Sequence, residues 1–404
     1  MQLSVIIINF NVKYFLEQCL LSVQKAGIGM DVEIIVVDNN STDGSREYLK
    51  PKFPGATFKW NNSNPGFGKA NNSVLREAKG NYILFLNPDT IIPEDCFSKC
   101  LDIFEKNPDC GALGVRMIDG SGKFLKESKR GLPSVSNSFY KMAGLSSVFP
   151  ESRTFAGYYA GHLKENETQI VDVLAGAFMM LSRKAIELTG GFDERFFMYA
   201  EDIDLSYRII QSGLKNYYFP QVSIIHFKGE STQRSSEGYI KHFYGAMQLF
   251  VQKHDPQKKM MQFMMGTAIK TGKILARFKQ RFKSSQKKEH KIYNTAVVAE
   301  QARFSDCVKI LQHADPPVII VGRVGIHAGD GAAAIGEINQ LGECIQRYKI
   351  ALLVFCEGAI TYKQIIALAG KHAGKTAYLF LGKNSKCIVG SDDKNARGKI
   401  IALP

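Results

Sequence analysis

IIVVDNNSTDGS, residues 34–45, passes from four apolar residues directly into a cluster of polar ones. The same transition occurs at SVIIINFN (residues 4–11) and at LFLNPDT (residues 84–90). Short apolar runs that end in polar or turn-forming residues are typical of buried strands. Helical patterns at residues 12–26 and 71–79 alternate with them. This alternation predicts an α/β fold with a largely parallel sheet and helices on its faces.

The predicted strands, at residues 4–8, 33–37 and 82–86, direct attention to the polar side chains that come after them. Open α/β sheets bind ligands beyond the carboxyl ends of their strands. Asp38 comes after the second strand, where its carboxylate can accept hydrogen bonds from a nucleotide base or ribose. Asp89 follows the third strand, and it can hold Mg²⁺ or Mn²⁺ against a diphosphate. Taken alone, either cluster could be only a turn that caps the next helix.

A third cluster, residues 190–205, places five carboxylates among aromatic residues. Asp202 lies next to Glu201, and a carboxylate among apolar neighbours can have its pKa adjusted for general-base work. Acidic residues also favour the first turn of a helix, which would explain one or two of the five. His226 ends a further apolar run, and as a lone histidine it is either structural or a second protein ligand of a metal.

Composition narrows the class of protein. A chain of 404 residues with 45% hydrophobic residues is long enough for about two folded domains. The eight cysteines form no CxxC pair, so we expect buried thiols in a reducing compartment and no zinc site. The N-terminus lacks the features of a signal peptide, and no apolar run is long enough to span a membrane. These features predict a cytoplasmic protein.

The charge distribution divides the chain. Between residues 256 and 291, eleven Lys or Arg face a single acidic residue, so most of the net charge of +14 lies there. Apolar residues recur in this segment at helical spacing, which predicts a basic amphipathic helix on an anionic membrane surface or a linker helix that docks on a domain. Nucleic acid is disfavoured as a partner, because the apolar positions of this segment are Met-rich and follow helical spacing, which is not the pattern of a base-stacking surface. We therefore expect a first domain at 1–253, a basic helical connector at 254–292 and a third part at 293–404.

The third part shows a second α/β pattern, with predicted strands at residues 318–321, 350–355 and 377–381 and two shorter ones after them. A small Rossmann-like domain fits this alternation. The glycine-rich stretch GRVGIHAGDG, residues 322–331, is expected as a turn after the first of these strands. It does not match the GxGxxG pattern, so tight turning explains its glycines better than phosphate binding does.

The first 250 or so residues resemble glycosyltransferase family 2, the inverting enzymes of the GT-A fold, and within it the rhamnosyltransferase-like branch. The matching segments occur in the expected order: SVIIINFN, IIVVDNNSTDGS, NPGFGKANN, LFLNPDT, LAGAFMMLSRKA, GGFDERFFMYAEDIDLSYR and IIHFKGEST. The wider family has Asp where this chain has Asn87, a difference that the rhamnosyltransferase-like branch shares. The membrane spans and the QxxRW signature of processive synthases are absent, which implies the addition of one sugar or a few.

The resemblance implies a role for each matching position. Asp38 would contact the base, Asp89 and His226 would bind Mn²⁺ or Mg²⁺, Asp202 would be the general base, and Glu201 would lie in the acceptor site. The remaining positions of the donor pocket would be Asn9, Asn11, Asn40, Gly68, Asn71 and Asn87.

The implied reaction moves a sugar from a nucleoside diphosphate to a hydroxyl of a glycan or a lipid-linked acceptor, with inversion, at the inner face of the cell membrane. Deoxythymidine-diphosphate-rhamnose is the expected donor, with uridine-diphosphate sugars as the alternative. Two other functions compete with this one. A catalytically silent nucleotide-sugar or glycan binding protein would be favoured by loss of Asp89, Asp202 or His226, and all three are present. A nucleotidyltransferase would need a glycine-rich phosphate loop after the first strand, where Asn9, Phe10 and Asn11 stand instead.

Overall fold

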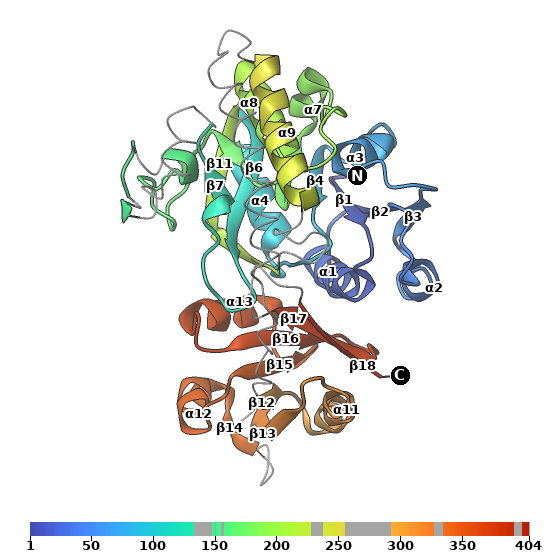
Figure 1. Ribbon diagram of the computed structural model, residues 1–404, viewed down its shortest axis with the longest axis vertical. Coiled ribbons are helices and arrows are strands. Elements are labelled where there is room, and N and C mark those ends of the chain that lie inside the picture. The colour runs from blue at the N-terminus through green and yellow to red at the C-terminus, as the bar shows by residue number, and fades with distance from the viewer. Residues whose placement is uncertain are drawn as a thin grey trace.

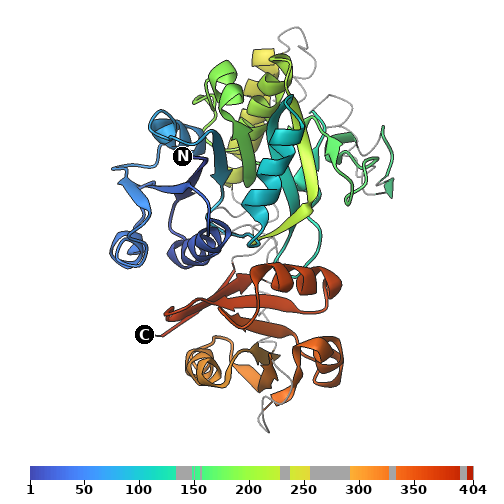
Figure 2. The same cartoon turned by 180° about the vertical axis from the view of Figure 1, so that it is seen from behind.

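The computed structural model of the chain describes residues 1–132, 148–149, 151–154, 157–227, 237–254, 292–326, 334–391 and 398–403. Two sheets dominate it. The first and larger lies in the N-terminal part, in the upper half of Figure 1, and the second lies in the C-terminal part below it. Figure 2 shows the same two bodies from behind. The predicted basic connector, 254–292, falls almost entirely outside the described residues, as does much of 133–156.

Within the described residues, the N-terminal sheet has nine strands. They are β1 (Leu3–Asn9), β2 (Val32–Asp38), β3 (Thr57–Trp60), β4 (Tyr82–Leu86), β5 (Thr90–Ile91), β6 (Cys110–Ile118), β8 (Gln169–Ile170), β10 (Phe178–Ser182) and β11 (Lys215–His226). Their order is β3-β2-β1-β4-β10-β6-β11-β5, with β8 paired to β11. The first four are parallel, whereas β10 runs antiparallel to β4 and β6. The sheet is therefore mixed, whereas the sequence pattern predicts a largely parallel one.

Helices cover both faces of this sheet. They are α1 (Lys13–Ala26), α2 (Ser45–Leu49), α3 (Phe67–Leu75), α4 (Cys96–Lys106), α7 (Arg183–Thr189), α8 (Glu201–Gln211) and α9 (Glu237–His254). Alternate residues of each strand face opposite sides, so β1 contributes Val5 and Ile7 to a core with α1 and α4, and Ile6 and Ile8 to a core with α3, α7 and α8. This alternation explains why the sequence of β1 is apolar throughout.

Short elements complete the N-terminal part: β7 (Lys129–Arg130), which pairs with β9 (Val173–Leu174), and the 3₁₀ turns η1 (Lys126–Ser128) and η2 (Gly157–Tyr159). None of the helices among the described residues combines the length and the apolar composition that a membrane crossing requires. All eight cysteines lie in described ranges, where they are buried and free of disulfides.

Within the described residues, the C-terminal sheet has seven strands: β12 (Tyr293–Val298), β13 (Val318–Gly325), β14 (Ala334–Glu337), β15 (Leu352–Cys356), β16 (Ala377–Leu381), β17 (Cys387–Ser391) and β18 (Lys399–Ala402). The order is β14-β13-β12-β15-β16-β17-β18. The first five are parallel and the last two antiparallel, so this sheet is also mixed. Its helices are α11 (Gln301–Leu311), η3 (Ile338–Gln340), α12 (Leu341–Arg347) and α13 (Tyr362–Lys371).

Three sequence expectations need correction. The helix expected at 71–79 begins at Phe67, because Gly66 adopts a positive φ of 92° that starts the helix four residues earlier. The C-terminal sheet begins with β12, one strand before the strand expected first. Gly322 lies inside β13 and not in a turn, and a Cβ there would meet the side chain of Ile335 at 2.4 Å. That glycine thus serves close packing.

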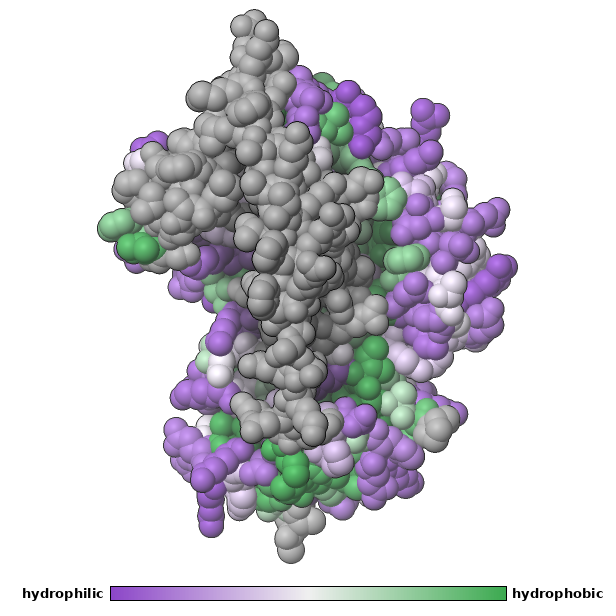
Figure 3. All heavy atoms as spheres, viewed as in Figure 1, coloured by the Kyte–Doolittle hydropathy of each residue, from purple (hydrophilic) through white to green (hydrophobic). Residues whose placement is uncertain are grey.

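The two sheets share a hydrophobic core. Phe15, Ile91, Ile118, Ile225 and Phe227 of the N-terminal part pack with residues of β15, β16 and α13 in one cluster. The N-terminal part therefore rests on a face of the C-terminal sheet. Figure 3 shows mainly hydrophilic residues on the described upper surface, with hydrophobic ones gathered lower down.

Candidate active site

The site begins where β1 and β2 end side by side. Their parallel register pairs Asn9 with Asp38, and the Asn9 amide donates to the Asp38 carboxylate at 2.6 Å. The same amide also reaches the hydroxyl of Ser45 at 2.9 Å. The second Asp38 oxygen accepts from the backbone N–H of Ser41 at 2.8 Å. Asn9 therefore orients Asp38, and both side chains are buried.

Asn11 and Asn40 shape the loops around this carboxylate. Both have left-handed backbones, with φ of 58° and 63°, which asparagine tolerates better than most residues. The Asn11 side chain accepts from the N–H of Thr42 at 2.7 Å, whereas Asn40 is exposed. Asn11 thus holds two loops together, and Asn40 remains accessible to a ligand.

Asn39 joins this loop to the segment that contains NPGFGKANN. Its amide donates to the side chain of Asn64 at 3.2 Å and to the carbonyl of Gly66 at 3.4 Å. The next N–H, of Phe67, donates to the carbonyl of Phe197 at 3.1 Å. A Cβ on Gly66 would meet that carbonyl at 2.5 Å, so the close approach requires glycine. Asn39 and Phe197 are thus part of the site that the sequence did not single out.

Gly68 and Asn71 lie on α3 behind this loop. A Cβ on Gly68 would meet the Phe192 side chain at 3.1 Å, so a larger residue would push α3 and the segment before α8 apart. Asn71 is fully buried and donates to the carbonyl of Phe67 at 2.9 Å, while its side-chain oxygen lacks a hydrogen-bond partner. These two positions shape the wall of the site.

Asn87 and Asp89 lie between β4 and β5, whereas His226 is the last residue of β11. The pairing of β5 with β11 brings the three side chains together. The register of β5 on β11 sets Thr90 opposite His226. As a result, His226 Nε2 lies 3.3 Å from Asp89 Oδ1 and 3.4 Å from Asn87 Nδ2. Asp89 and His226 are both buried, and His226 Nδ1 has no hydrogen-bond partner.

This pair fits a divalent cation in its donor chemistry. Two ligands about 2.1 Å from one metal ion and at right angles lie ~3 Å apart, close to the separation of Asp89 Oδ1 and His226 Nε2. An amide flip would let Asn87 present its oxygen in the same place. Among the described residues no group of three or more His, Cys, Asp or Glu gathers as a metal site, so further ligands would come from phosphate and water.

Asp202 stands at the start of α8 within a set of donors. One carboxylate oxygen accepts from Arg130 Nη2 at 2.5 Å and from the N–H of Gly176 at 3.0 Å. The other accepts from the N–H of Ile203 at 2.8 Å. A Cβ on Gly176 would lie 3.3 Å from the Asp202 Cβ, so glycine permits this approach. Arg130, in a segment without clear periodicity, gave no signal in the sequence.

Glu201 differs from its neighbour. Burial raises its pKa to about 8, and the nearby negative charge of Asp202 acts in the same direction. One of its oxygens, Oε2, is buried without a hydrogen-bond partner. The expected adjustment of a carboxyl pKa by burial is therefore found at Glu201. A protonated Glu201 can donate a hydrogen bond, whereas the ion-paired Asp202 carboxylate accepts.

Two adjacent residues, Gly176 and Ala177, link Asp202 to Asn87. The Gly176 N–H donates to Asp202, and the carbonyl of the next residue, Ala177, accepts from the N–H of Asn87 at 3.0 Å. Gly176 and Ala177 therefore connect the carboxylate of Asp202 to the segment that contains Asp89. Hydrogen bonds thus connect the segments of Asn87 and Asp202, and those of Asn39 and Phe197 are connected through Gly66 and Phe67.

Asp204 has a different task. Its buried carboxylate binds Arg208 at 2.8 Å, Lys253 at 2.7 Å and His254 at 2.6 Å. It thereby ties α8 to α9, and the arrangement is structural.

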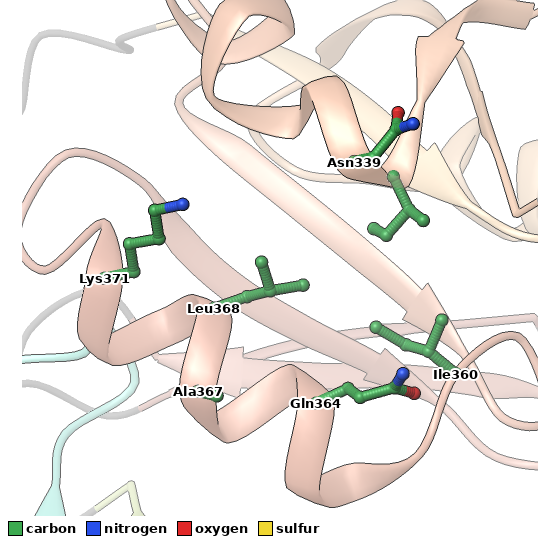
Figure 4. A pocket seen from close by; sticks show the side chains of 7 residues that line it. Asn339, Ile360, Gln364, Ala367, Leu368 and Lys371 are labelled. Carbon is green, nitrogen blue, oxygen red and sulfur yellow. The ribbon is translucent and has the colours of Figure 1, made fainter.

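One hollow lies in the C-terminal part, and a second is lined by residues of both parts, among them Lys25, Glu94 and Glu357. Figure 4 shows the first, of about 310 Å³, lined by Ile360 and by residues of η3 and α13, with Asn339 and Lys371 at opposite sides. Its walls are mainly apolar and it contains no cluster of catalytic side chains. This hollow therefore offers no alternative to the candidate site at the N-terminal sheet.

Comparison with known proteins supports this assignment. Residues 4–188 match the model of glycosyl transferase family 2. The N-acetylglucosaminyl-diphospho-decaprenol L-rhamnosyltransferase of Mycobacterium tuberculosis is 28% identical over 260 residues, covering 62% of this chain and 83% of that protein. Rhamnosyltransferase WbbL of Escherichia coli is 29% identical over 171 residues, covering 40% of this chain and 61% of WbbL.

Among solved structures, the mannosyltransferase PcManGT from Pyrobaculum calidifontis, in complex with GDP-Man and Mn²⁺, aligns with a TM-score of 0.43 and 16% identity, over 78% of this chain and 81% of that one. A similarity this low carries no argument here. The family match and the curated relatives identify residues 4–188 as a glycosyltransferase domain of family 2.

Proposed function

We propose that the chain is an inverting, metal-assisted glycosyltransferase that moves a sugar, rhamnose in the first instance, from a nucleoside diphosphate to a hydroxyl of a glycan or lipid-linked acceptor. The observation that supports it most is that two adjacent residues, Gly176 and Ala177, hydrogen-bond to Asp202 and to Asn87, which lies beside the Asp89–His226 pair. Transfer needs a base for the acceptor hydroxyl and a means to neutralise the leaving diphosphate, and these two groups supply both.

The chain's own residues would divide the work between donor and acceptor. Asp38, oriented by Asn9, accepts hydrogen bonds from the base of the donor, while Asn11, Asn40, Gly68 and Asn71 shape its pocket. A divalent ion, Mn²⁺ or Mg²⁺, held by Asp89 and His226 with Asn87 beside them, would offset the charge of the departing diphosphate.

On the acceptor side, Asp202 takes the proton of the attacking hydroxyl, and Arg130 and the Gly176 N–H hold its carboxylate in place. Protonated Glu201 donates a hydrogen bond to the acceptor next to it. Attack from the face opposite the leaving group inverts the anomeric carbon.

The choice of sugar and acceptor is guided by the relatives. Both curated relatives named above are rhamnosyltransferases, and the acceptor in the first one's name carries a decaprenol lipid. A lipid-linked acceptor also suits the basic segment 256–291, which would rest on the cytoplasmic face of an anionic membrane. We keep 1–253, 254–292 and 293–404 as the proposed division of the chain.

The decisive experiment measures donor hydrolysis and transfer over a panel of nucleotide sugars, with and without Mn²⁺, for the wild type and Asp202→Asn. We expect metal-dependent turnover of one donor, reduced roughly 10²- to 10⁴-fold in the variant because its amide cannot accept the proton. Nucleotide binding should persist in the variant. Turnover that survives the substitution would refute Asp202 as the base. Metal-dependent nucleotide binding without any turnover by the wild type would favour a binding protein.

A further inference from the structure

Phe227, the residue after His226, is enclosed by both parts of the molecule. Its ring lies 5.3 Å from Phe15 of α1 and 5.8 Å from Phe380 of β16, measured between ring centroids. Both contacts are edge-to-face, the arrangement that aromatic pairs favour. Phe227 is 1% exposed and Phe380 2%. A ring from the C-terminal sheet therefore packs one residue away from a proposed metal ligand.

The backbone of Phe227 also contacts the other proposed ligand. Its N–H donates to the carbonyl of Asp89 at 3.0 Å. Asp89 and His226 stand at the ends of β5 and β11, a pair with only two residue pairs in register. So short a ladder needs further contacts, and the buried side chain of Phe227 supplies one of them, together with the hydrogen bonds of Thr90 to Asn87 and of Ile92 to Ser22.

The C-terminal part is fixed in position by polar contacts as well. Both oxygens of Glu94, next to β5, accept backbone N–H groups at the start of α13, from Tyr362 at 2.7 Å and Lys363 at 3.0 Å. The carbonyl of Gly120 accepts from the N–H of Tyr378 at 2.9 Å. A carboxylate at a helix N-terminus is favourable because it satisfies free N–H groups and complements the helix dipole.

We propose that the C-terminal sheet forms the rear wall of the metal site, and that Phe380 is a positioning residue that acts through Phe227 on Asp89 and His226. The inference rests on the proposed function, since it takes these two residues as metal ligands. It gives the C-terminal part a role: to keep the ligand pair at the right separation. Residues that orient metal ligands without touching the metal commonly affect metal affinity strongly.

The test compares Phe380→Leu with Phe355→Leu. Phe355 is 1% exposed and belongs to the same core, and its ring lies 6.2 Å from that of Phe380, but its described ring contacts are with Tyr378 and Phe380 and not with Phe227. Mn²⁺ binding is measured by electron paramagnetic resonance in the presence of UDP or dTDP, without acceptor. In parallel, NMR follows the His226 ring signals, assigned by their loss in His226→Gln.

We expect Phe380→Leu to weaken Mn²⁺ binding about tenfold and to shift the His226 signals, and Phe355→Leu to leave binding within about twofold. Affinity for the nucleotide without metal should stay unchanged in both. Equal effects of the two variants, or none, would overturn the positioning role while leaving the metal site intact. Absence of Mn²⁺ binding by the wild type would instead refute the proposed metal site, and the inference with it.

If circular dichroism shows that Phe380→Leu does not fold, the variant Glu94→Gln is tested in its place. This variant leaves the aromatic core intact and loosens the docking of α13 on the N-terminal part. We expect a smaller loss of Mn²⁺ affinity together with a shift of the same His226 signals. Unchanged signals in a folded Glu94→Gln protein with normal Mn²⁺ affinity would overturn the proposal.

Discussion

The two sheets of this molecule share a strand order and differ at the edge where ligands bind. Both contain four parallel strands in which the third, second, first and fourth along the chain lie side by side: β3-β2-β1-β4 in one and β14-β13-β12-β15 in the other. The carboxyl ends of β1 and β2 carry Asn9 and Asp38, and Asp89 comes soon after β4. The corresponding strands β12, β13 and β15 end at Val298, Gly325 and Cys356.

The residues just beyond the C-terminal strands explain the difference. Next to β15, the N-terminus of α13 is the place where such a sheet would hold an anion. Here the carboxylate of Glu94 from the N-terminal part already accepts its N–H groups. The same topology thus carries the proposed catalytic site in one half and a docking contact in the other, and the loops after the strands make the distinction.

If the carboxyl edges of the two sheets have different functions, removal of a negative charge should lower turnover at one edge and not at the other. Asp89→Asn should lower turnover roughly hundredfold, about 3 kcal/mol of transition-state stabilisation, because the metal ion proposed to neutralise the leaving diphosphate would lose a charged protein ligand. The matched change Glu357→Gln, just after β15, should leave turnover unchanged. Steady-state rates at saturating donor over a range of Mn²⁺ concentrations measure both.

Rescue by high Mn²⁺ would separate the two roles that Asp89 can have. If Asp89 binds the metal, part of the activity of Asp89→Asn returns as the Mn²⁺ concentration rises. A loss that no metal concentration relieves would indicate that Asp89 supports the fold of the β4–β5 turn instead. A comparable loss in Glu357→Gln would show that the C-terminal edge takes part in the chemistry.

The sequence predicted those parts of the site that depend on strand ends. Asp38, Asp89 and His226 each end or follow an apolar run, and the structure brings Asp89 and His226 together. Arg130 was not predicted, because its partner Asp202 is 72 residues away and its own segment has no periodicity. Phe380 was missed for a related reason: an apolar residue in a strand looks the same whether it packs inside its own domain or against another.

The same limit applies to the fold. The strand at 82–86 was predicted to the residue, since a fully buried strand is apolar along its whole length. The start of α3 was missed because Gly66 turns the chain through a positive φ that only its contact with Phe197 explains. The antiparallel insertion of β10 likewise depends on contacts between distant segments. Local patterns predict elements, whereas contacts between distant segments decide how they are joined.

Glu201 offers a test that depends on pH. Because burial raises its pKa from 4.5 to about 8, the folded chain holds this proton more tightly than the unfolded chain does. The stabilisation is complete below pH 4.5 and is lost as the pH rises through about 8. Within that window it falls by about 1.4 kcal/mol per pH unit. Glu201→Gln, which stays neutral, should remove this slope.

Urea unfolding of the wild type and of Glu201→Gln at pH 5.5, 6.5 and 7.5 measures the effect. The free energies of unfolding of the two proteins should change relative to each other by roughly 1 to 3 kcal/mol over this range. The exposed neighbour Glu194, changed to Gln, is the control and should behave like the wild type. Parallel curves for the wild type and Glu201→Gln would contradict a protonated Glu201 in the folded state. Within the described residues of the C-terminal sheet, no Asp or Glu is buried as Glu201 is.

The smallest expected effect concerns the free energy of unfolding and the contact of Glu94 with the N-terminus of α13. Glu94→Ala removes both acceptors from the N-terminus of α13 and should lower the free energy of unfolding by about 1 to 2 kcal/mol. Lys363→Ala removes a nearby ion pair with Asp95, in which the lysine side chain is 60% exposed, and it should cost under about 0.5 kcal/mol.

Titration calorimetry with inorganic phosphate tests whether this helix N-terminus can bind an anion. If phosphate binds to Glu94→Ala and not to the wild type, the edge of the C-terminal sheet is an anion site that Glu94 of the N-terminal part fills. Equal stability of Glu94→Ala and the wild type would instead show that the shared apolar core holds the two parts together without a contribution from Glu94.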